Sequence, residues 1–583
     1  MQPRYSTSGL TARRIDMSDV TLWTLYREGV AYHNKMGFST KFPTFVRFKE
    51  GDQWPQATER TKNLPRPVLN IVDMIVRSKR SSVLDQPVSI VYRQGSASGD
   101  EILDQMHQDA AENCTEYART IWDRADMDKL CNEACDDAAT NGTGIWHFYW
   151  DTSVTGDKYV GELRGETVDA LNFFVANPQL RDVQKQDYLI IAQRLKLGAV
   201  RKMAKDRGLP AEKVANICPD EFEDASTYLA ERIELDGKEN EKVTVLTKYY
   251  RKNGEVVFDK ATRSVEICTA VPLTPQGSPT RIKLYPVAAL NWKLRKACFY
   301  GIGEIEGLIP NQKLINFMYG MQALAIQQMG FPKIVAKPGA IRQPLTNEPG
   351  EIVTDYSNGG ISYLQPPAFS SAATQVSNDM IDLTRVVTGT TEVTTGESLG
   401  ANMAASAIIA LQNQAQTPVN EIQRRYWHAV KEIGRIWMEF FKTYCSDKRD
   451  IVIEMGDEVS GRAFTGTDYA MYDFDLQVDV GASSEYSAVL AQATLDKMLD
   501  RGDISIDQYI ELSDPNVAPF KEKFKRMRET QPQAVGMPGV PAEEVNGVQS
   551  VSGIGGVPLP DVPKAPTVMD KFTGGGNNAV PKL

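Results

Sequence analysis

The sequence predicts an α+β protein that is mainly helical, and two patterns support this fold class. Long stretches repeat apolar residues every three or four positions, as the buried face of a helix does. Shorter stretches alternate apolar and polar residues between Gly, Asn and Pro turns, as strands do. At 583 residues, with 42% hydrophobic and 24% charged residues, the chain has the length for several domains and a composition typical of globular proteins.

Helices and strands are mixed through the first 306 residues. Apolar periodicity predicts helices over 18–36, over 64–84 with Pro65 and Pro67 near its start, and twice within 100–140. A loop containing FKEGDQWP (48–55) is expected between the first two helices. Alternation predicts strands over 87–95, over the pair 142–152 and 161–168, over 285–294, and over 242–258, where Asn253-Gly254 is a hairpin turn.

The stretch GLIPNQKLINFMYGMQALAIQQMGFP (307–332) differs in character from everything before it. It reads as one helix, with Pro310 tolerated in the first turn, and Lys313 is its single charged residue. A helix nearly free of charge on all sides is not the surface helix of a monomer. We therefore expect this helix either in the core or packed between neighbouring subunits.

The remainder of the chain is predicted from the same signals. Its expected parts are a β-rich insert of three short strands (332–367), a helix (374–387), a Thr/Gly-rich segment (388–402), a long helix (403–445), strands (450–482), two short helices (486–528) and a tail (531–583). Pro418 predicts a kink in the long helix, and Gly502 is expected to end a helix rather than to form part of an Arg-Gly-Asp recognition motif. The tail holds 8 Pro and 9 Gly, so it is expected to be flexible or to dock on a partner.

Two short motifs match the patterns of a catalytic site and a cofactor site, but the surrounding sequence does not support either function. GESLG (396–400) matches the nucleophile elbow of hydrolases, but His428 is the only later histidine, and Glu421 is the only acid between it and Ser398. GIGEIEG (301–307) places its third glycine one position too late for a dinucleotide-binding turn. There is no phosphate loop, and no second Cys/His pair at metal spacing accompanies Cys131 and Cys135, so we expect no catalytic residue, metal or cofactor.

Several stretches resemble the portal (head–tail connector) proteins of tailed bacteriophages, those of short-tailed phages above all. They are GDQW (51–54) followed by LPRPVLNIVDMIV, SVLDQPVSIVYR with Gly99-Asp100, and FYGIGEIEGLIPNQKLIN (299–316). The resemblance covers residues 1–530 and rests on pattern and on these short motifs. We expect Trp54 in GDQW to be a packing anchor rather than a partner contact.

The resemblance implies a ring of identical subunits, usually twelve, at one capsid vertex with a central DNA channel. It divides the chain into a wing (1–306), a first stem helix (307–331), a clip (332–367), a second stem helix (368–387), a tunnel loop (388–402), a long kinked wing helix with returning wing strands (403–485), a helical crown (486–530) and the tail (531–583). The tail shows no long helical barrel pattern.

The same resemblance implies three groups of site residues. Stem residues expected at the subunit interface are Gln312, Ile315, Asn316 and Gln322. Clip residues expected to contact terminase or adaptors are Lys333, Lys337, Arg342 and Glu348; the three cations could also touch DNA or face solvent. Tunnel-loop residues expected to face the DNA are Thr391, Thr394, Thr395, Glu397, Ser398 and Asn402.

The expected partners are further copies of the chain, double-stranded DNA, the large terminase subunit, the major capsid and scaffolding proteins, and head–tail adaptor or tail proteins. The protein is expected in the virion after assembly in the host cytoplasm, without a membrane. A net charge of −10 agrees with a channel that passes DNA without holding its phosphates. The alternatives are another virion component, such as an adaptor or baseplate protein, and a serine hydrolase using Ser398.

Overall fold

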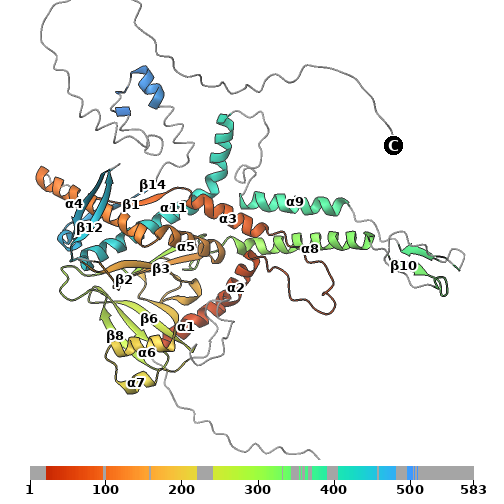
Figure 1. Cartoon of the computed structure of the whole chain (residues 1–583), viewed down its shortest axis with the longest axis horizontal. Helices are drawn as coiled ribbons and strands as arrows, with labels where there is room; N and C mark the ends of the chain where they lie inside the picture. Colours follow the sequence, from red (N-terminus) through yellow and green to blue (C-terminus); the bar gives the residue numbers. More distant parts are fainter. Residues whose placement is uncertain are drawn as a thin grey trace, which may run out of the picture. The chain divides into compact units, whose positions relative to one another are not determined.

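The computed structural model of the chain describes residues 21–95, 100–156, 159–219, 241–330, 333–342, 354, 356, 361–364, 371–389, 405–455, 458–480, 495–502, 504–505 and 508–509. Contacts divide the chain into two units, Met1–Lys525 and Arg526–Leu583, and all described residues belong to the first. This unit mixes helices with antiparallel sheets, which confirms the α+β class (Figure 1).

Helices make up the larger part of the described secondary structure. The α-helices are α1 (Thr21–Met36), α2 (Phe38–Lys49), α3 (Ile71–Leu84), α4 (Glu101–Arg124), α5 (Met127–Asn141), α6 (Leu197–Asp206), α7 (Ala211–Ala215), α8 (Ile305–Gly330), α9 (Ser371–Thr388) and α11 (Ala405–Tyr444). Short 3-10 turns are η1 (Ala170–Asn172), η2 (Val183–Lys185) and η4 (Gly466–Tyr469). Residues 495–501 are also helical, and Gly502 follows them with a φ of 76°, as expected for a helix end.

The described strands form five sheets, and every pairing among them is antiparallel. The strands are β1 (Val88–Gln94), β2 (Thr143–Thr155), β3 (Val160–Thr167), β4 (Phe173–Val175), β5 (Tyr188–Lys196), β6 (Lys242–Lys252), β7 (Glu255–Ala261), β8 (Glu266–Pro272), β9 (Val287–Asn291), β10 (Lys333–Ala336), β11 (Ile361–Leu364), β12 (Arg449–Met455), β13 (Glu458–Phe464) and β14 (Phe474–Val480). Their orders are β3-β2-β9, β4-β5-β6-β7-β8, β1-β14, β10-β11 and β12-β13. The predicted turn between β6 and β7 is present, with positive φ at Asn253 and Gly254.

The long helix α11 runs through the main hydrophobic core. The apolar stripe predicted from its sequence is buried along Val430, Ile433, Trp437 and Phe440, against α3, β9 and β14. Pro418 lies inside the helix and cannot donate a backbone hydrogen bond. Figure 1 shows α11 changing direction along its length, as the proline predicts.

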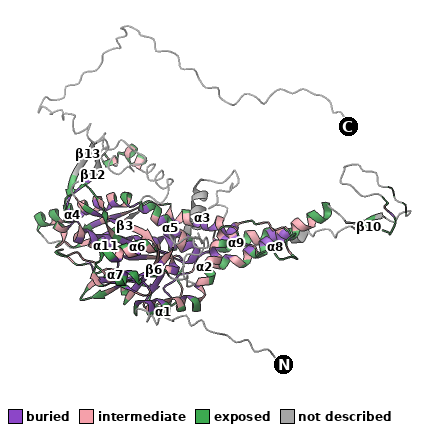
Figure 2. Ribbon diagram, turned by 60° about the horizontal axis from the view of Figure 1, so that its bottom comes forward, coloured by how far each residue is buried: buried purple, intermediate pink, exposed green. Residues whose placement is uncertain are grey.

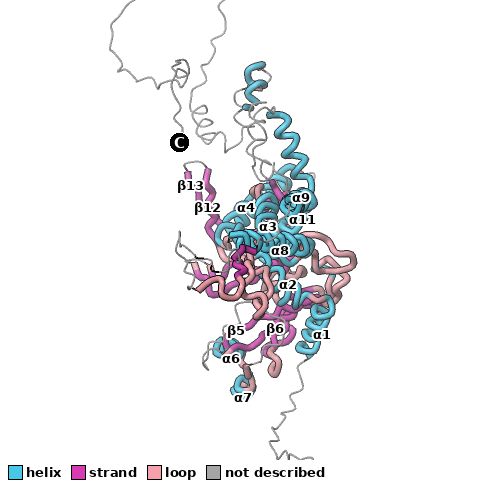
Figure 3. Tube along the Cα trace, turned by 90° about the vertical axis from the view of Figure 1, so that its right-hand side faces the viewer, coloured by secondary structure: helices cyan, strands magenta, loops and turns pink. Residues whose placement is uncertain are grey.

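The five-stranded sheet carries helices on both faces (Figure 3). On one face α1 buries Leu22, Trp23 and Tyr26 against Ile190 and Leu246. On the other face α6 and α7 bury an apolar cluster against β6 and β8, made of Val200, Ala204, Val214, Ile217, Val243, Val245 and Ile267. These two clusters fix the helices that flank the sheet.

A buried histidine connects this sheet to the three-stranded sheet. His147 of β2 lies 2.9 Å from Glu166 Oε1 of β3 through Nδ1 and 2.9 Å from the Tyr249 hydroxyl of β6 through Nε2. Gln193 of β5 donates a further hydrogen bond to the same carboxylate oxygen at 2.9 Å. Hydrogen bonds, with the burial of the carboxyl opposing them, hold the pKa of Glu166 below its usual value, so both sheets share one satisfied polar bridge.

The glycines of GIGEIEG serve close backbone packing. A Cβ on Gly301 would lie 2.3 Å from the Gly142 carbonyl oxygen, and a Cβ on Gly303 would lie 2.3 Å from that of Thr140. The backbone of this segment therefore lies against the end of α5, and Glu304 N donates to the Ala139 carbonyl at 2.7 Å. The spacing that resembles a dinucleotide-binding turn is a packing contact at the entrance to α8.

Two sequence predictions near the N-terminus are wrong. The expected loop after residue 36 contains a helix, α2, whose Phe38, Phe42, Phe45 and Phe48 are all buried. Their spacing follows the helix period, and burial of four aromatic rings outweighs the cost of Pro43 inside the helix. The helix predicted over 64–84 begins only at residue 71, because the preceding prolines stay non-helical and Asn70 caps the helix by accepting a hydrogen bond from Asp73 N.

The close packing at Gly303 generates a stability prediction. Gly303→Ala is expected to lower the free energy of unfolding by about 2–4 kcal/mol, because its methyl group must displace backbone atoms. Gly307→Ala is the matched control: it lies on the exposed first turns of α8 with no heavy atom within 4 Å of the added Cβ, and is expected to be neutral or stabilising by about 0.5 kcal/mol. Urea unfolding of both variants at equal protein concentration measures the difference; equal midpoints would contradict the packing account.

Candidate functional site

Two buried amide side chains hold the first half of α8 against the chain's own body. Gln312 Nε2 donates to the Leu69 carbonyl at 2.6 Å, and its Oε1 accepts from Ile71 N at 3.1 Å. Asn316 Nδ2 donates to Gln53 Oε1 at 2.6 Å, and its Oδ1 accepts from Gln312 at 2.9 Å and from Leu69 N at 3.3 Å. The nitrogen and the oxygen of each amide have at least one hydrogen-bond partner, so both side chains can be buried without an unpaired polar atom.

The GDQW segment forms the other side of this contact. Gln53 Nε2 donates to the Phe48 carbonyl at 2.7 Å and to Asn70 Oδ1 at 3.0 Å. Trp54 Nε1 donates to the Pro67 carbonyl at 3.0 Å, and the far edge of its ring lies 3.5 Å from the position of a Cβ on Gly320. Gln53 and Trp54 therefore have packing roles within the chain, as predicted for the tryptophan.

A buried charge cluster lies at the entrance to α8. Glu304 receives Lys79 Nζ at 2.6 Å, Lys293 Nζ at 2.9 Å and Trp292 Nε1 at 3.0 Å. Burial alone would raise the pKa of Glu304, but the two ammonium groups outweigh it and hold the pKa below its usual value. Burial lowers the pKa of Lys79, with Glu304 opposing the shift. The paired charges fix where α8 leaves the body.

The helices α8 and α9 pack along each other (Figure 1). Asn311 Nδ2 donates to Thr384 Oγ1 at 3.2 Å, and Gln322 Nε2 donates to Ser377 Oγ at 3.3 Å. As residue number rises along α8 it falls along α9, so the helices are antiparallel. Together they connect the body to the short β10–β11 ladder.

Large apolar side chains lie exposed along this helical pair, where Figure 2 colours exposed positions green. On α8, Leu314, Phe317 and Met321 form a stripe at i, i+3 and i+7, with Phe317 54% exposed. On α9, Val376, Leu383 and Val387 form a stripe at i, i+7 and i+11, with Val387 80% exposed. Further exposed apolar residues on the pair are Ile326, Met329 and Val386. Exposed apolar surface on this scale marks an interaction site.

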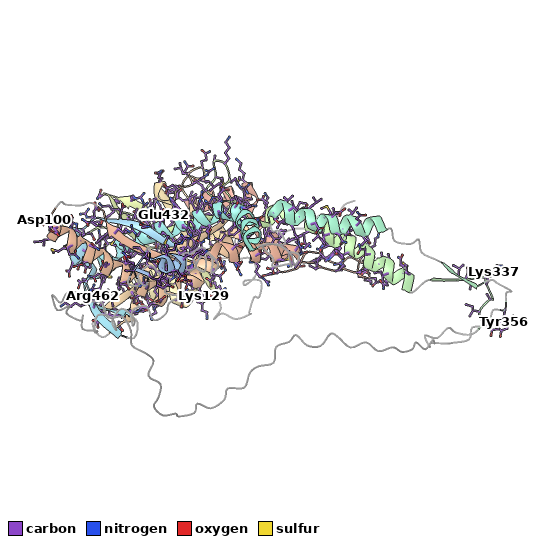
Figure 4. The ribbon with its side chains drawn as sticks, turned by 90° about the horizontal axis from the view of Figure 1, so that it is seen from above. Asp100, Lys129, Lys337, Tyr356, Glu432 and Arg462 are labelled. Atoms are coloured by element: carbon purple, nitrogen blue, oxygen red, sulfur yellow. The ribbon has the colours of Figure 1, made fainter. Side chains whose placement is uncertain are left out.

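The described part of the β10–β11 tip is also exposed. Val335 and Tyr356 are both about half exposed, and the Arg342 guanidinium lies 4.7 Å from the centre of the Tyr356 ring. Tyr356 N donates to the Ala340 carbonyl at 3.1 Å, which joins two segments of the tip. Figure 4 shows Lys337 and Tyr356 at the end of the molecule that α8 and α9 lead to.

The predicted stem residues differ in their burial and in their surroundings. Gln312, Ile315 and Asn316 are buried inside the chain, so their side chains face its own interior rather than a neighbour. Gln322 lies between α8 and α9. The predicted set was chosen for the hydrogen-bonding capacity of amides. It did not include Leu314, Phe317 and Met321, which are exposed and whose helical spacing is visible in the sequence.

The other predicted site residues are placed only in part. Lys337 and Arg342 are exposed at the tip. Lys333 lies in β10, but its side chain falls outside the described residues, as does the whole of Glu348. All six tunnel-loop residues also lie outside the described residues: Thr391, Thr394, Thr395, Glu397, Ser398 and Asn402.

In the described ranges, no three His, Cys, Asp or Glu side chains gather in a group that could hold a metal ion. His428, the only histidine that could serve Ser398, is exposed on α11. Among the helices of the described residues, none has both the length and the apolar character that a bilayer crossing requires.

The amide anchor generates a second prediction. Gln312→Ala is expected to lower the free energy of unfolding by roughly 2–3 kcal/mol, because the Leu69 carbonyl and Ile71 N lose their buried partner. Gln327→Ala is the matched control on the exposed part of the same helix and should change the unfolding free energy by less than about 0.5 kcal/mol. Thermal or urea unfolding of the two variants side by side decides the point; similar losses for both would show that the anchor contributes nothing specific.

Comparison with known proteins agrees with the resemblance seen in the sequence. The family described as Phage P22-like portal protein matches residues 44–545, which include α3 to α11 and all of the described strands. No curated protein sequence matches the chain. The match covers most of the chain, so this protein belongs to the P22-like family of phage portal proteins.

Proposed function

We propose that copies of this chain assemble into a closed ring at one vertex of the capsid, and that the ring forms the channel for genome packaging and ejection. The expected number of copies is twelve. Membership of the portal family supports the role. The observation that carries the arrangement is the exposed apolar surface of α8 and α9, which no part of the described chain covers.

The apolar stripes have the properties of a surface between copies. They lie on two packed helices, one of which is anchored in the body through buried amides, so the stripes are presented in a fixed geometry. Burying a Leu, Phe or Val side chain stabilises an interface by about 1.5–3 kcal/mol each, before the cost of association. In a ring, the stripe of one copy can contact the next copy around the whole circle, and closure leaves no stripe uncovered.

The described elements fit the expected parts of a portal subunit. We assign the body up to residue 306, with α11 and β12 to β14, to the wing, α8 and α9 to the two stem helices, and the β10–β11 segment to the clip. The helical residues 495–501 fall within the expected crown. Lys337, Arg342 and Tyr356 are candidate clip contacts for the terminase during packaging and for tail adaptors afterwards, because they are exposed at the far end of the stem.

The segment 388–402 is proposed to face the channel. It joins α9 to α11, and its only charged residues are Glu392 and Glu397. Hydroxyl and glycine residues can contact or obstruct DNA without the ionic hold that slows its passage. The wing is proposed to contact the major capsid and scaffolding proteins.

Ring assembly can be tested with charges placed in the stripes. The double variant Phe317→Asp, Val387→Asp is expected to fold but to stay monomeric, because both side chains are exposed in the single chain and two desolvated carboxylates would cost several kcal/mol per interface. Sedimentation and negative-stain electron microscopy report the assembly state. Val160→Asp, at a 58% exposed apolar position on β3, is the control and should still form rings. Intact rings of the double variant would refute the proposed interface.

The channel role of the loop is tested by its removal. Deletion of residues 390–400 is expected to leave ring assembly intact and to reduce DNA packaging or retention in particles by at least about tenfold. The readout is DNA content per particle, measured beside ring formation of the purified variant. If the deletion prevents ring formation, or leaves DNA content unchanged, the loop does not have this role.

A further inference from the structure

Basic residues gather on α6, α7 and the turns beside them. Residues 196–213 contain six basic and two acidic residues, a net charge of +4, within a chain whose net charge is −10. The six basic residues are Lys196, Arg201, Lys202, Lys205, Arg207 and Lys213, which we call the basic tip. Five of these side chains are exposed, and Arg201 is partly buried, where its Nη2 donates to the Ile217 carbonyl at 2.9 Å.

Within the described part of the chain, the cations of the basic tip are not paired with acids. Among the described residues, no carboxylate lies within 4.0 Å of any of them, although Asp206 and Glu212 are in the same stretch. Elsewhere in the described body many Lys and Arg residues are paired, as Lys49 and Arg80 are with Asp136. The tip therefore keeps a local positive potential on an acidic protein.

The fold holds these charges close together. Arg201 and Lys205 are i, i+4 on α6, and Lys202 and Lys205 are i, i+3, so like charges are neighbours on one helix face. Like charges at such positions cost stability. A bound polyanion removes that cost.

The helices are fixed from beneath, so the basic face is presented to solvent. Val200, Ala204, Val214 and Ile217 are buried against β6 and β8, on the side of α6 and α7 away from the lysines. Figures 1 and 3 show α6 and α7 at the margin of the body, beside the five-stranded sheet. The tip does not need to reorganise in order to bind.

We infer that the basic tip is a binding site for the phosphate backbone of double-stranded DNA, distinct from the channel. Residues 196–213 contain no aromatic residue, and the Phe258 ring, 5.7 Å from the Arg207 guanidinium, is only partly exposed. Long lysine and arginine side chains in such a setting suit the phosphates of a duplex rather than stacking on single-stranded bases. Contacts with phosphates depend on the charge of the DNA and not on its base sequence. In the assembled portal the ligand is packaged DNA that lies against the wing, and this last step rests on the proposed function.

Binding is tested with the full-length chain and a fluorescein-labelled 30-base-pair duplex, by anisotropy between 50 and 200 mM NaCl. The wild type is expected to bind with a slope of log K against log salt of about −3 to −4, since each phosphate contact contributes about −0.9. The variant Lys202→Gln, Lys205→Gln, Lys213→Gln should bind at least about tenfold more weakly at 50 mM NaCl, with the slope reduced by about 2–3. A matched control, Lys35→Gln, Lys252→Gln, Lys296→Gln, removes three exposed lysines outside the tip and should bind within about twofold of wild type.

A nicked circular plasmid separates the tip from the channel. A closed ring cannot thread a circle, so retention of this plasmid in a gel-shift assay reports the outer surface alone. The wild type should retain it and the tip variant should not. The assembly state is measured in the same samples: loss of binding from intact rings supports the inference, and a failure of ring formation bears on the proposed function instead.

Three results would overturn the inference. Equal binding by the wild type and the tip variant would exclude the tip as the site. Equal losses in the tip and control variants would indicate general electrostatics. No wild-type binding at 50 mM NaCl would mean that the tip meets an acidic protein surface, or the chain's own residues 220–240, which hold eight acidic and two basic residues and lie outside the described residues.

Discussion

The contact on which the rest of this structure depends is the one between the first half of α8 and the chain's own body, made by side-chain amides. Gln312 and Asn316 satisfy backbone groups at residues 69 and 71 and are themselves satisfied in return. Amides can do this without the desolvation cost of ions. Because these amides are buried, the start of a nearly uncharged helix is held rigidly while its far end stays exposed. Only a helix held in this way can present apolar stripes to a neighbour in a defined direction.

Helices and strands with a strong apolar periodicity could be predicted from the sequence. Residues 307–330 lie in one helix, the strand pairs around residues 142–168 and 242–261 are present, and the stripe along Ile422, Tyr426 and Val430 is buried. Boundaries failed where local and tertiary preferences disagreed: α2 forms despite Pro43, since four phenylalanines reach the core, and α3 starts late because prolines precede it. Tertiary burial decides such cases, and it is not visible in a window of sequence.

The site was harder to predict than the fold. A helix almost without charge was expected either in the core or between subunits; one face of its first half is buried in the chain's own core, whereas its last residues, from Ile326, are exposed. The sequence alone could not show which residues of this helix are buried and which are exposed. Gln312 and Gln327 are the same residue type with opposite exposures, because the 53–71 segment lies against Gln312 and not against Gln327. The basic tip was also missed, since its four excess positive charges disappear within a total of −10. Whole-chain charge describes solubility and long-range steering, but local faces determine binding.

The central claim, that the exposed stripes of α8 and α9 meet neighbouring copies, is tested most directly by methionine oxidation. Met321 and Met329 lie among the exposed apolar residues of α8, whereas Met471 is 94% exposed in the turn before β14. Purified rings and dissociated chains would be treated with dilute peroxide. Mass spectrometry would then measure sulfoxide formation at each methionine. The account predicts that assembly slows oxidation of Met321 at least several-fold while Met471 stays reactive. Equal oxidation of Met321 in rings and in single chains would contradict it.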